Sequence, residues 1–224
     1  MNLLVYNMIM KGKKFMEHEP TANAQPYPIW DKPVTTAPKT PNEPQGRDTF
    51  QTPNYATDLI IPYIPKSVKR IWEPAAGEGR LAGRLEQSGY RVWRSDIRKL
   101  NEKTTIYNFI SEEVLEFPID GYNLAIITNP PFSIKEEFIE RCLEYNIPWA
   151  LLINADYSGK QIDWIKRGCE KLIPNRRIDF ITPTGRNGKT SSSQFHTMWL
   201  TYGFNLGKTE TFVELSLKDK KENI

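Results

Sequence analysis

Short apolar runs alternate with amphipathic segments from about residue 48 onward. The runs at 68–72, 122–128 and 148–154 are rich in aliphatic and β-branched residues, which is typical of buried parallel strands. Between them, 80–87 and 134–145 repeat apolar residues at helical spacing. Strands that alternate with helices predict an α/β fold, a mostly parallel sheet with helices on both faces.

Weaker patterns complete the predicted sheet. Residues 90–96 predict a second strand, and 104–110 a third strand or its loop. A helix is expected at 54–61, with Thr52 as a candidate cap and Pro53 at its first position. Later elements are a helix at 159–167, strands at 177–181 and 195–202 flanking a polar loop at 183–194, and an edge strand at 209–217. The two strands around the loop predict an antiparallel C-terminal hairpin.

The first 47 residues have a different composition from the rest. Prolines recur among Thr, Asn, Lys and Glu, and no helical or strand period survives. We therefore expect an extended, largely irregular arm at 1–47, one folded domain at 48–217 and a frayed Lys-rich tail at 218–224. At 224 residues, the chain is long enough for one domain with a sizeable core.

Composition narrows the classes of protein. The net charge is only +3, so a basic surface would have to be local. Cys142 and Cys169 lack metal-ligand spacing and are expected to be buried free thiols in a reducing cytosol, and no metal site is expected. No apolar run reaches transmembrane length, and the apolar start at 3–10 lacks the flanks of a signal peptide. These features predict a cytoplasmic protein that does not contact membranes.

A turn of small residues follows the first predicted strand. Glu73-Pro74-Ala75-Ala76-Gly77-Glu78-Gly79 allows close approach of a ligand to the backbone and leads into a helix with free amides. It lacks the third glycine of the dinucleotide fingerprint and the Lys-Ser/Thr of a phosphate loop. Glu73 would repel a phosphate but attract an amino group. The turn therefore favours a zwitterionic ligand that carries adenosine.

Two later positions fit the same ligand. Asp96 ends the second predicted strand, about 20 residues past the glycine turn, where an acid binds ribose hydroxyls. A cap on the next helix is the alternative role for Asp96. Asn108 is a candidate for a hydrogen bond to an adenine edge, and Phe109 for stacking on the ring or for packing in the core.

Asn129-Pro130-Pro131-Phe132 follows the strand at 122–128. Two prolines make the turn stiff and present the Asn129 side chain and nearby carbonyls at the carboxyl edge of the sheet, where open α/β sheets bind ligands. Acceptors beside an aromatic ring suit a flat ring that bears an –NH2 group. A plain strand terminator is the alternative.

Taken in order, Glu73–Gly79, Asp96, Asn108-Phe109 and Asn129–Phe132 resemble the Rossmann-like S-adenosylmethionine-dependent methyltransferases. The Asn-Pro-Pro-Phe turn is similar to that of the adenine-N6 DNA methyltransferases, in a minimal form like those of phages. The similarity spans about residues 48–205. Phe132 stands where many relatives have tyrosine.

The resemblance implies that S-adenosylmethionine binds at Thr52, Glu73, Ala75, Gly77, Gly79, Asp96, Ile97, Asn108, Phe109 and Asn129. It also implies that Asn129, Pro130, Pro131 and Phe132 hold a flipped adenine for methylation of its amine. DNA is expected to bind the basic region 160–189. Because the chain has no room for a separate recognition domain, a partner chain or a dimer is a further expectation. Adenine in RNA, a glutamine amide in protein, and a silent binding subunit remain the alternatives.

Overall fold

The computed structural model describes residues 50–111, 123–155, 157–181, 190–191 and 195–222, all of which belong to one compact unit, 33–224. The predicted arm at 1–47 and most of the predicted polar loop at 183–194 lie outside the described residues. Among the described residues, no helix combines the length and the apolar character needed to cross a membrane.

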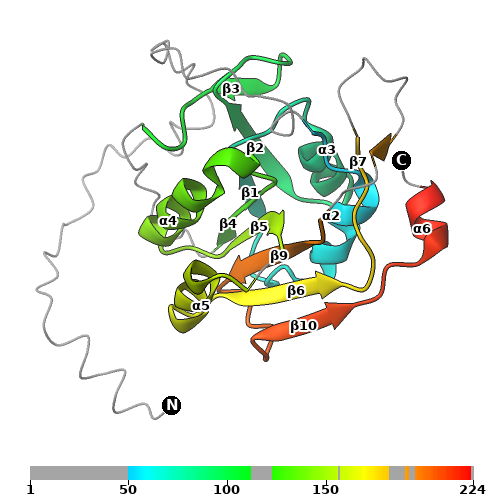
Figure 1. The fold of residues 1–224 in the computed structure, drawn as a ribbon. Helices are drawn as coiled ribbons and strands as arrows, with labels where there is room; N and C mark the ends of the chain where they lie inside the picture. The colour runs from blue at the N-terminus through cyan, green and yellow to red at the C-terminus, as the bar shows by residue number, and fades with distance from the viewer. Residues whose placement is uncertain (1–49, 112–122, 156, 182–189, 192–194, 223–224) are drawn as a thin grey trace, which may run out of the picture. The chain divides into compact units, whose positions relative to one another are not determined.

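Eight strands form the main sheet, in the order β10-β6-β9-β5-β4-β1-β2-β3 (Figure 1). Within it, β9 runs antiparallel to both of its neighbours, β5 and β6, and the other neighbouring pairs are parallel. This arrangement confirms the predicted fold class, a Rossmann-like α/β sheet of the class I methyltransferase type with an antiparallel strand near its C-terminal end. The strands span β1 Arg70–Glu73, β2 Arg91–Asp96, β3 Thr104–Ile106, β4 Leu124–Thr128, β5 Trp149–Asn154, β6 Glu170–Pro174, β9 Thr197–Tyr202 and β10 Glu210–Val213.

Helices cover both faces of the sheet (Figure 1). α2 (Asn54–Ile60) and α3 (Arg80–Gln87) pack on one face, where the apolar cluster includes Ile71, Ala125 and Trp199. α4 (Lys135–Tyr145) and α5 (Gly159–Lys166) cover the other face. The shorter helices are η2 (Ile61–Tyr63), η4 (Phe132–Ile134) and α6 (Leu217–Glu222).

An aromatic cluster fills the core beneath α4. Trp72 stacks on Trp93 with ring centroids 4.6 Å apart, and it meets the edges of Phe109 and Tyr145. Its indole N–H donates to the Ser95 hydroxyl, so the polar atom is satisfied at full burial. The cluster fixes the carboxyl ends of β1 and β2, which carry Glu73 and Asp96.

The C-terminal third differs from the prediction in one strand. The prediction placed a strand of the sheet at 177–181, but β6 at Glu170–Pro174 takes that position. Only Phe180–Ile181 is extended, as β7, and it pairs with β8 (Thr190–Ser191) in a separate two-stranded sheet. The sequence did not predict β6 because it contains polar residues. Its Lys171 is buried in the structure and forms an ion pair with Glu210 of β10, 3.3 Å away.

Three smaller expectations also differ. Thr52 does not cap α2, because Pro53 holds the cap position without a side-chain hydrogen bond. β3 ends at Ile106, before Asn108. A short helix, α6, lies where a frayed tail was expected, and the Ser216 hydroxyl accepts from the Asp219 amide in its first turn. Cys142 and Cys169 are buried free thiols, as predicted.

Candidate functional site

A pocket that is partly open to solvent lies at the carboxyl ends of β1, β2 and β4. This edge is where ligands bind in open α/β sheets. The pocket brings together ten residues that the sequence singled out, from segments far apart in the chain. They are Thr52, Glu73, Ala75, Gly77, Asp96, Ile97, Asn108, Phe109, Asn129 and Pro131.

The glycine turn is held in place from several sides. The Ala76 amide donates to the Ser95 carbonyl at 3.0 Å, and the Gly77 amide donates to Asp96 Oδ2 at 2.9 Å. Gly77 and Gly79 have φ of +52° and +83°, values that favour glycine. The turn is therefore shaped before any ligand arrives. Gly79 itself does not line the pocket; it caps α3 and lies against Arg94.

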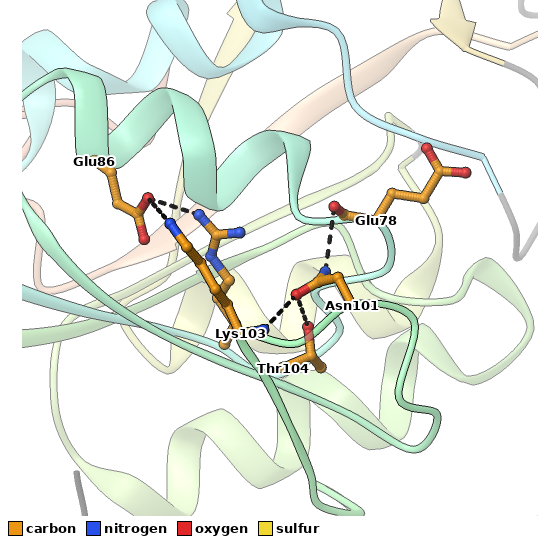
Figure 2. Close-up of polar contacts among 6 residues, drawn as sticks. Glu78, Glu86, Asn101, Lys103 and Thr104 are labelled. Atoms are coloured by element: carbon orange, nitrogen blue, oxygen red, sulfur yellow. Dashed lines mark hydrogen bonds and ion pairs between the residues drawn. The ribbon is translucent and has the colours of Figure 1, made fainter. Parts of the chain in front are cut away.

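The loop after β2 supports the turn from outside (Figure 2). Asn101 donates its side-chain amide to the Glu78 carbonyl at 3.3 Å, and its oxygen accepts from the Lys103 amide and the Thr104 hydroxyl. Glu86 of α3 lies 2.7 Å from Arg94 Nη2 and 4.0 Å from Lys103 Nζ. These bonds join α3, β2 and the 97–103 loop around the turn.

Asp96, the predicted ribose ligand, lies in the wall of the pocket. Its carboxylate is 7 % exposed and lines the pocket. Oδ2 accepts from the Gly77 amide, and Oδ1 accepts from the Arg98 amide at 3.0 Å. Each carboxylate oxygen accepts more than one hydrogen bond, so capacity for ligand hydroxyls remains. Asp96 thus supports the turn as well as facing the pocket.

Glu73 is the most deeply buried acid of the pocket, at 2 % exposure. Its Oε2 has no hydrogen-bond partner in the described part of the chain. Burial raises the pKa of the Glu73 carboxyl well above its usual range, and the neighbouring Arg94 charge and the Ala82 amide offset this effect only in part. Burial and the unpartnered Oε2 therefore favour the protonated form of the Glu73 carboxyl in the free protein.

The segment before α2 closes one side of the pocket. Gln51 exchanges backbone hydrogen bonds with Ile181 of β7, and its side-chain oxygen accepts from the Glu78 amide at 3.2 Å. A Cβ on Gly77 would lie 2.9 Å from the Gln51 amide nitrogen, so a larger residue would have to displace the end of that side chain. Thr52, buried beside Gln51, faces the pocket. Gln51 thus connects the glycine turn to the C-terminal third.

Asn129 faces the pocket from the next strand, β4. Its side-chain oxygen is buried and has no hydrogen-bond partner among the described residues. Pro131 follows it into the pocket wall, and the Pro131 carbonyl accepts from the Ile134 amide to start η4. An unpartnered buried acceptor is costly in a free protein, so a ligand donor is the natural partner for this oxygen.

Two predicted catalytic residues do not line the pocket. Pro130 is buried, and Phe132 packs edge-on against Phe180 and Phe195, with centroids 5.8 and 5.3 Å away. The predicted stacking of Phe132 on a base is left untested by this arrangement. Phe180 also stacks on Phe50, so the Asn129 turn and the segment before α2 share one aromatic cluster.

Asn108 and Phe109 reach the pocket in different ways. The Asn108 oxygen accepts from the Ile110 and Ser111 amides, which leaves its –NH2 group as the one to offer an adenine nitrogen. Phe109 is almost fully buried against Trp72 and Phe138, and only its margin lines the pocket. For Phe109, core packing and a pocket contact are combined.

Several pocket residues were missed from the sequence: Phe50, Gln51, Arg98, Ile110, Ile134 and Phe138. Gln51 gave no signal, because its role depends on a contact with a turn 26 residues later. Ile134 and Phe138 belong to the predicted helix at 134–145, and helical spacing gives no hint that the first turn of this helix borders the pocket. The signal that could have found them is their place in the chain, because the helix that follows a binding turn starts beside the pocket.

The predicted basic region is largely paired where the structure describes it. Lys160 contacts Glu136, Arg167 lies 2.7 Å from Glu140 Oε2, and Lys171 is buried with Glu210. Arg176 and Arg177 are exposed just past the carboxyl end of β6, at the pocket's edge of the sheet. Arg186 and Lys189 lie outside the described residues.

The fold is that of the Rossmann-like class I methyltransferase type, with its pocket at the carboxyl edge of the sheet. No protein-family model matches the chain, and no curated protein matches it by sequence. Several solved structures are similar, among them the following three. One is PH1948 of Pyrococcus horikoshii, proposed to be an RNA methyltransferase, at 15% identity and TM-score 0.48, covering 71% of this chain and 88% of that one.

The second is the 23S rRNA methyltransferase ErmE, at 16% identity and TM-score 0.45, covering 72% of this chain and 70% of that one. The third is the type IIG restriction endonuclease BpuSI, at 13% identity and TM-score 0.38; the match covers 66% of this chain but 24% of that one. Identities of this size leave the substrate open.

Proposed function

We propose that this protein transfers a methyl group from S-adenosylmethionine to the exocyclic amine of adenine in DNA. The observation that carries the proposal is the buried Asn129 oxygen, which faces the same pocket as Glu73 Oε2; neither oxygen has a hydrogen-bond partner among the described residues. One acceptor suits a neutral amine and the other suits an ammonium group. The two lie at the ends of adjacent strands, β4 and β1.

The residues of the pocket fit the cofactor group by group. Asp96 can accept the ribose hydroxyls, the Asn108 –NH2 can donate to an adenine nitrogen, and Ala75 to Gly77 offer a close backbone. Glu73 and Thr52 border the side of the pocket assigned to the amino-acid end. Bound there, the cofactor would supply an electrophilic methyl group on a sulfonium.

The residues of this chain orient the amine rather than activate it with a strong base. The amine nitrogen of adenine is a weak nucleophile, because its lone pair is delocalised into the ring. When the Asn129 oxygen and the Pro130 carbonyl accept its two N–H groups, the nitrogen is favoured in a pyramidal form with its lone pair free. Positioning and preorganised acceptors then provide most of the catalysis.

DNA binding is assigned to the exposed cations at the pocket's edge. Within the region 160–189, Arg176 suits a phosphate contact, because it is exposed beside that edge. Lys166, Arg167 and Lys171 are less suited, since each lies within 4.0 Å of an acidic side chain. Pairing leaves little charge to offer a phosphate.

Methyl transfer from tritiated cofactor tests the proposal. Duplex DNA, single-stranded DNA, total RNA and a protein lysate are each incubated with the wild type, Asn129→Ala and Asn123→Ala. Asn123 is the matched control, because it lies at the opposite end of β4 and bonds Arg70 at 2.8 Å. We expect label on adenine in DNA with the wild type and Asn123→Ala, and about 10²–10³-fold slower labelling with Asn129→Ala. Label only in RNA or on glutamine would reassign the substrate, and no label anywhere would favour a binding subunit.

A further inference from the structure

Glu73 and Arg94 are direct neighbours in the sheet. They are register partners on the parallel strands β1 and β2 and so point toward the same face, the one covered by α3. Arg94 nevertheless pairs with Glu86 of α3, at 2.7 Å, and its Nε has no hydrogen-bond partner among the described residues. Arg94, the one cation that acts on Glu73 among the described residues, is thus paired with a different carboxylate.

The charges around Glu73 come from two elements, β2 and α3. β2 contributes Arg94 and, at its end, Asp96, and α3 contributes Glu86 and the amide of Ala82. Two carboxylates therefore face Glu73 against a single guanidinium that is already paired. Near-complete burial, with a smaller contribution from these two carboxylates, raises the pKa of Glu73 well above its ordinary value and so favours the protonated form in the free protein.

We propose that the amino-acid end of the cofactor displaces the proton of Glu73, so that cofactor binding is coupled to proton release. The inference rests on the proposed function, because it assigns the ammonium group of that cofactor to the unpartnered Glu73 oxygen. An ammonium donates hydrogen bonds and brings a positive charge, both of which favour the carboxylate. The O–H bond of Glu73 breaks, and the proton passes to the buffer.

Glu73 would then act as a selective element of the pocket. A ligand with adenosine but no cationic end leaves Glu73 protonated and unpartnered, whereas the zwitterionic cofactor supplies the missing partner. Below the titration of Glu73, the affinity for the cofactor rises with pH, approaching tenfold per pH unit. The affinity for an uncharged adenosine compound stays constant over the same range.

Isothermal titration calorimetry measures the coupling directly. S-Adenosylhomocysteine, which has the same amino-acid end, is titrated at one pH in phosphate and in Tris, whose ionisation enthalpies differ. The dependence of the observed enthalpy on the buffer gives the number of protons released. We expect release approaching one proton for S-adenosylhomocysteine, and none for 5′-methylthioadenosine, which lacks the amino-acid end.

Two variants separate Glu73 from other groups. Glu73→Gln keeps the shape but cannot titrate, and it should abolish proton release while still binding S-adenosylhomocysteine. Glu102→Gln removes the same charge from a side chain that is 95% exposed, and it should leave the release intact. If Glu73→Gln does not fold, the pH profile of wild-type affinity provides the same test.

The outcomes distinguish the two proposals. Binding of S-adenosylhomocysteine with ordinary affinity but no proton release, or release that persists in Glu73→Gln, overturns this inference and leaves the proposed function standing. Failure of both adenosine compounds to bind the wild type overturns the proposed function itself.

Discussion

The two turns that form the pocket differ in how completely they are satisfied. The glycine turn at 74–79 is bonded on every side, to Ser95, Asp96, Gln51 and Asn101. The Asn129 turn is stiffened by its prolines, yet the Asn129 oxygen has no partner among the described residues. One turn is thus a preformed cradle, and the other keeps a free acceptor. We infer that the glycine turn shapes the cofactor site and that the Asn129 turn binds the substrate.

The largest expected effect is the loss of methyl transfer when the Asn129 side chain is removed. Asn129→Ala removes the acceptor that is to hold the amine and should lower methyl transfer by about 10²–10³-fold, as for other preorganised catalytic groups. Affinity for S-adenosylhomocysteine should change little, because the glycine turn is intact. Single-turnover rates and calorimetry measure the two effects. Equal losses in both would show that Asn129 serves the cofactor instead.

Asp96→Ala tests the other turn. It removes the ribose acceptor and the partner of the Gly77 amide, so affinity for S-adenosylhomocysteine should fall by roughly 10–100-fold, the cost of a charged hydrogen bond or two. The rate of transfer from bound cofactor should fall much less. Asp96→Asn is the matched control, since it keeps one acceptor oxygen. Unchanged affinity in Asp96→Ala would reject the assigned role.

Gly79→Ala tests how tightly the cradle is built. Gly79 and Gly89 both have strongly positive φ, so alanine at either should cost about 1–2 kcal/mol of strain. At Gly79 the new Cβ would also lie 2.7 Å from Arg94 Nη1, whereas nothing lies within 4 Å at Gly89. Thermal unfolding should therefore show a larger loss for Gly79→Ala. Equal losses of stability in the two variants would mean that the Arg94 side chain moves away from the new Cβ at no cost in free energy.

Glu73→Gln should stabilise the free protein above the ordinary titration range of glutamate. Burial raises the pKa of folded Glu73, so the folded state holds a proton that the unfolded state releases. Wild-type stability therefore falls as pH rises from the unfolded pKa through the folded one. The variant lacks this loss, and each kcal/mol recovered should raise the midpoint by about 2–4 °C. Parallel melting curves against pH would argue against a neutral Glu73.

The smallest effect concerns DNA contacts. Arg176→Gln should weaken DNA binding several-fold and reduce the slope of log affinity against log salt by about 1, as expected for one lost phosphate contact. Lys166→Gln, at the far end of α5 and within 3.7 Å of Asp163, is the control and should change little. A larger effect at Lys166 would place the nucleic acid on the opposite edge of the sheet.

The sequence predicted the parts of the molecule that rest on local pattern. The apolar runs located β1, β4 and β5, and the offset from the glycine turn located Asp96 at the end of β2. It did not predict β6, because Lys171 is neutralised by a residue 39 positions away. Nor did it predict the pocket contact of Gln51 or the packing of Phe132 against Phe180, which depend on tertiary contacts.

The position of a bound cofactor tests the central claim most directly. A crystal structure with S-adenosylhomocysteine should show its ribose on Asp96, its amino group near Glu73 and its sulfur facing the Asn129 oxygen across space for one amine. A pocket that stays empty at saturating ligand, or a sulfur directed away from Asn129, would contradict the account.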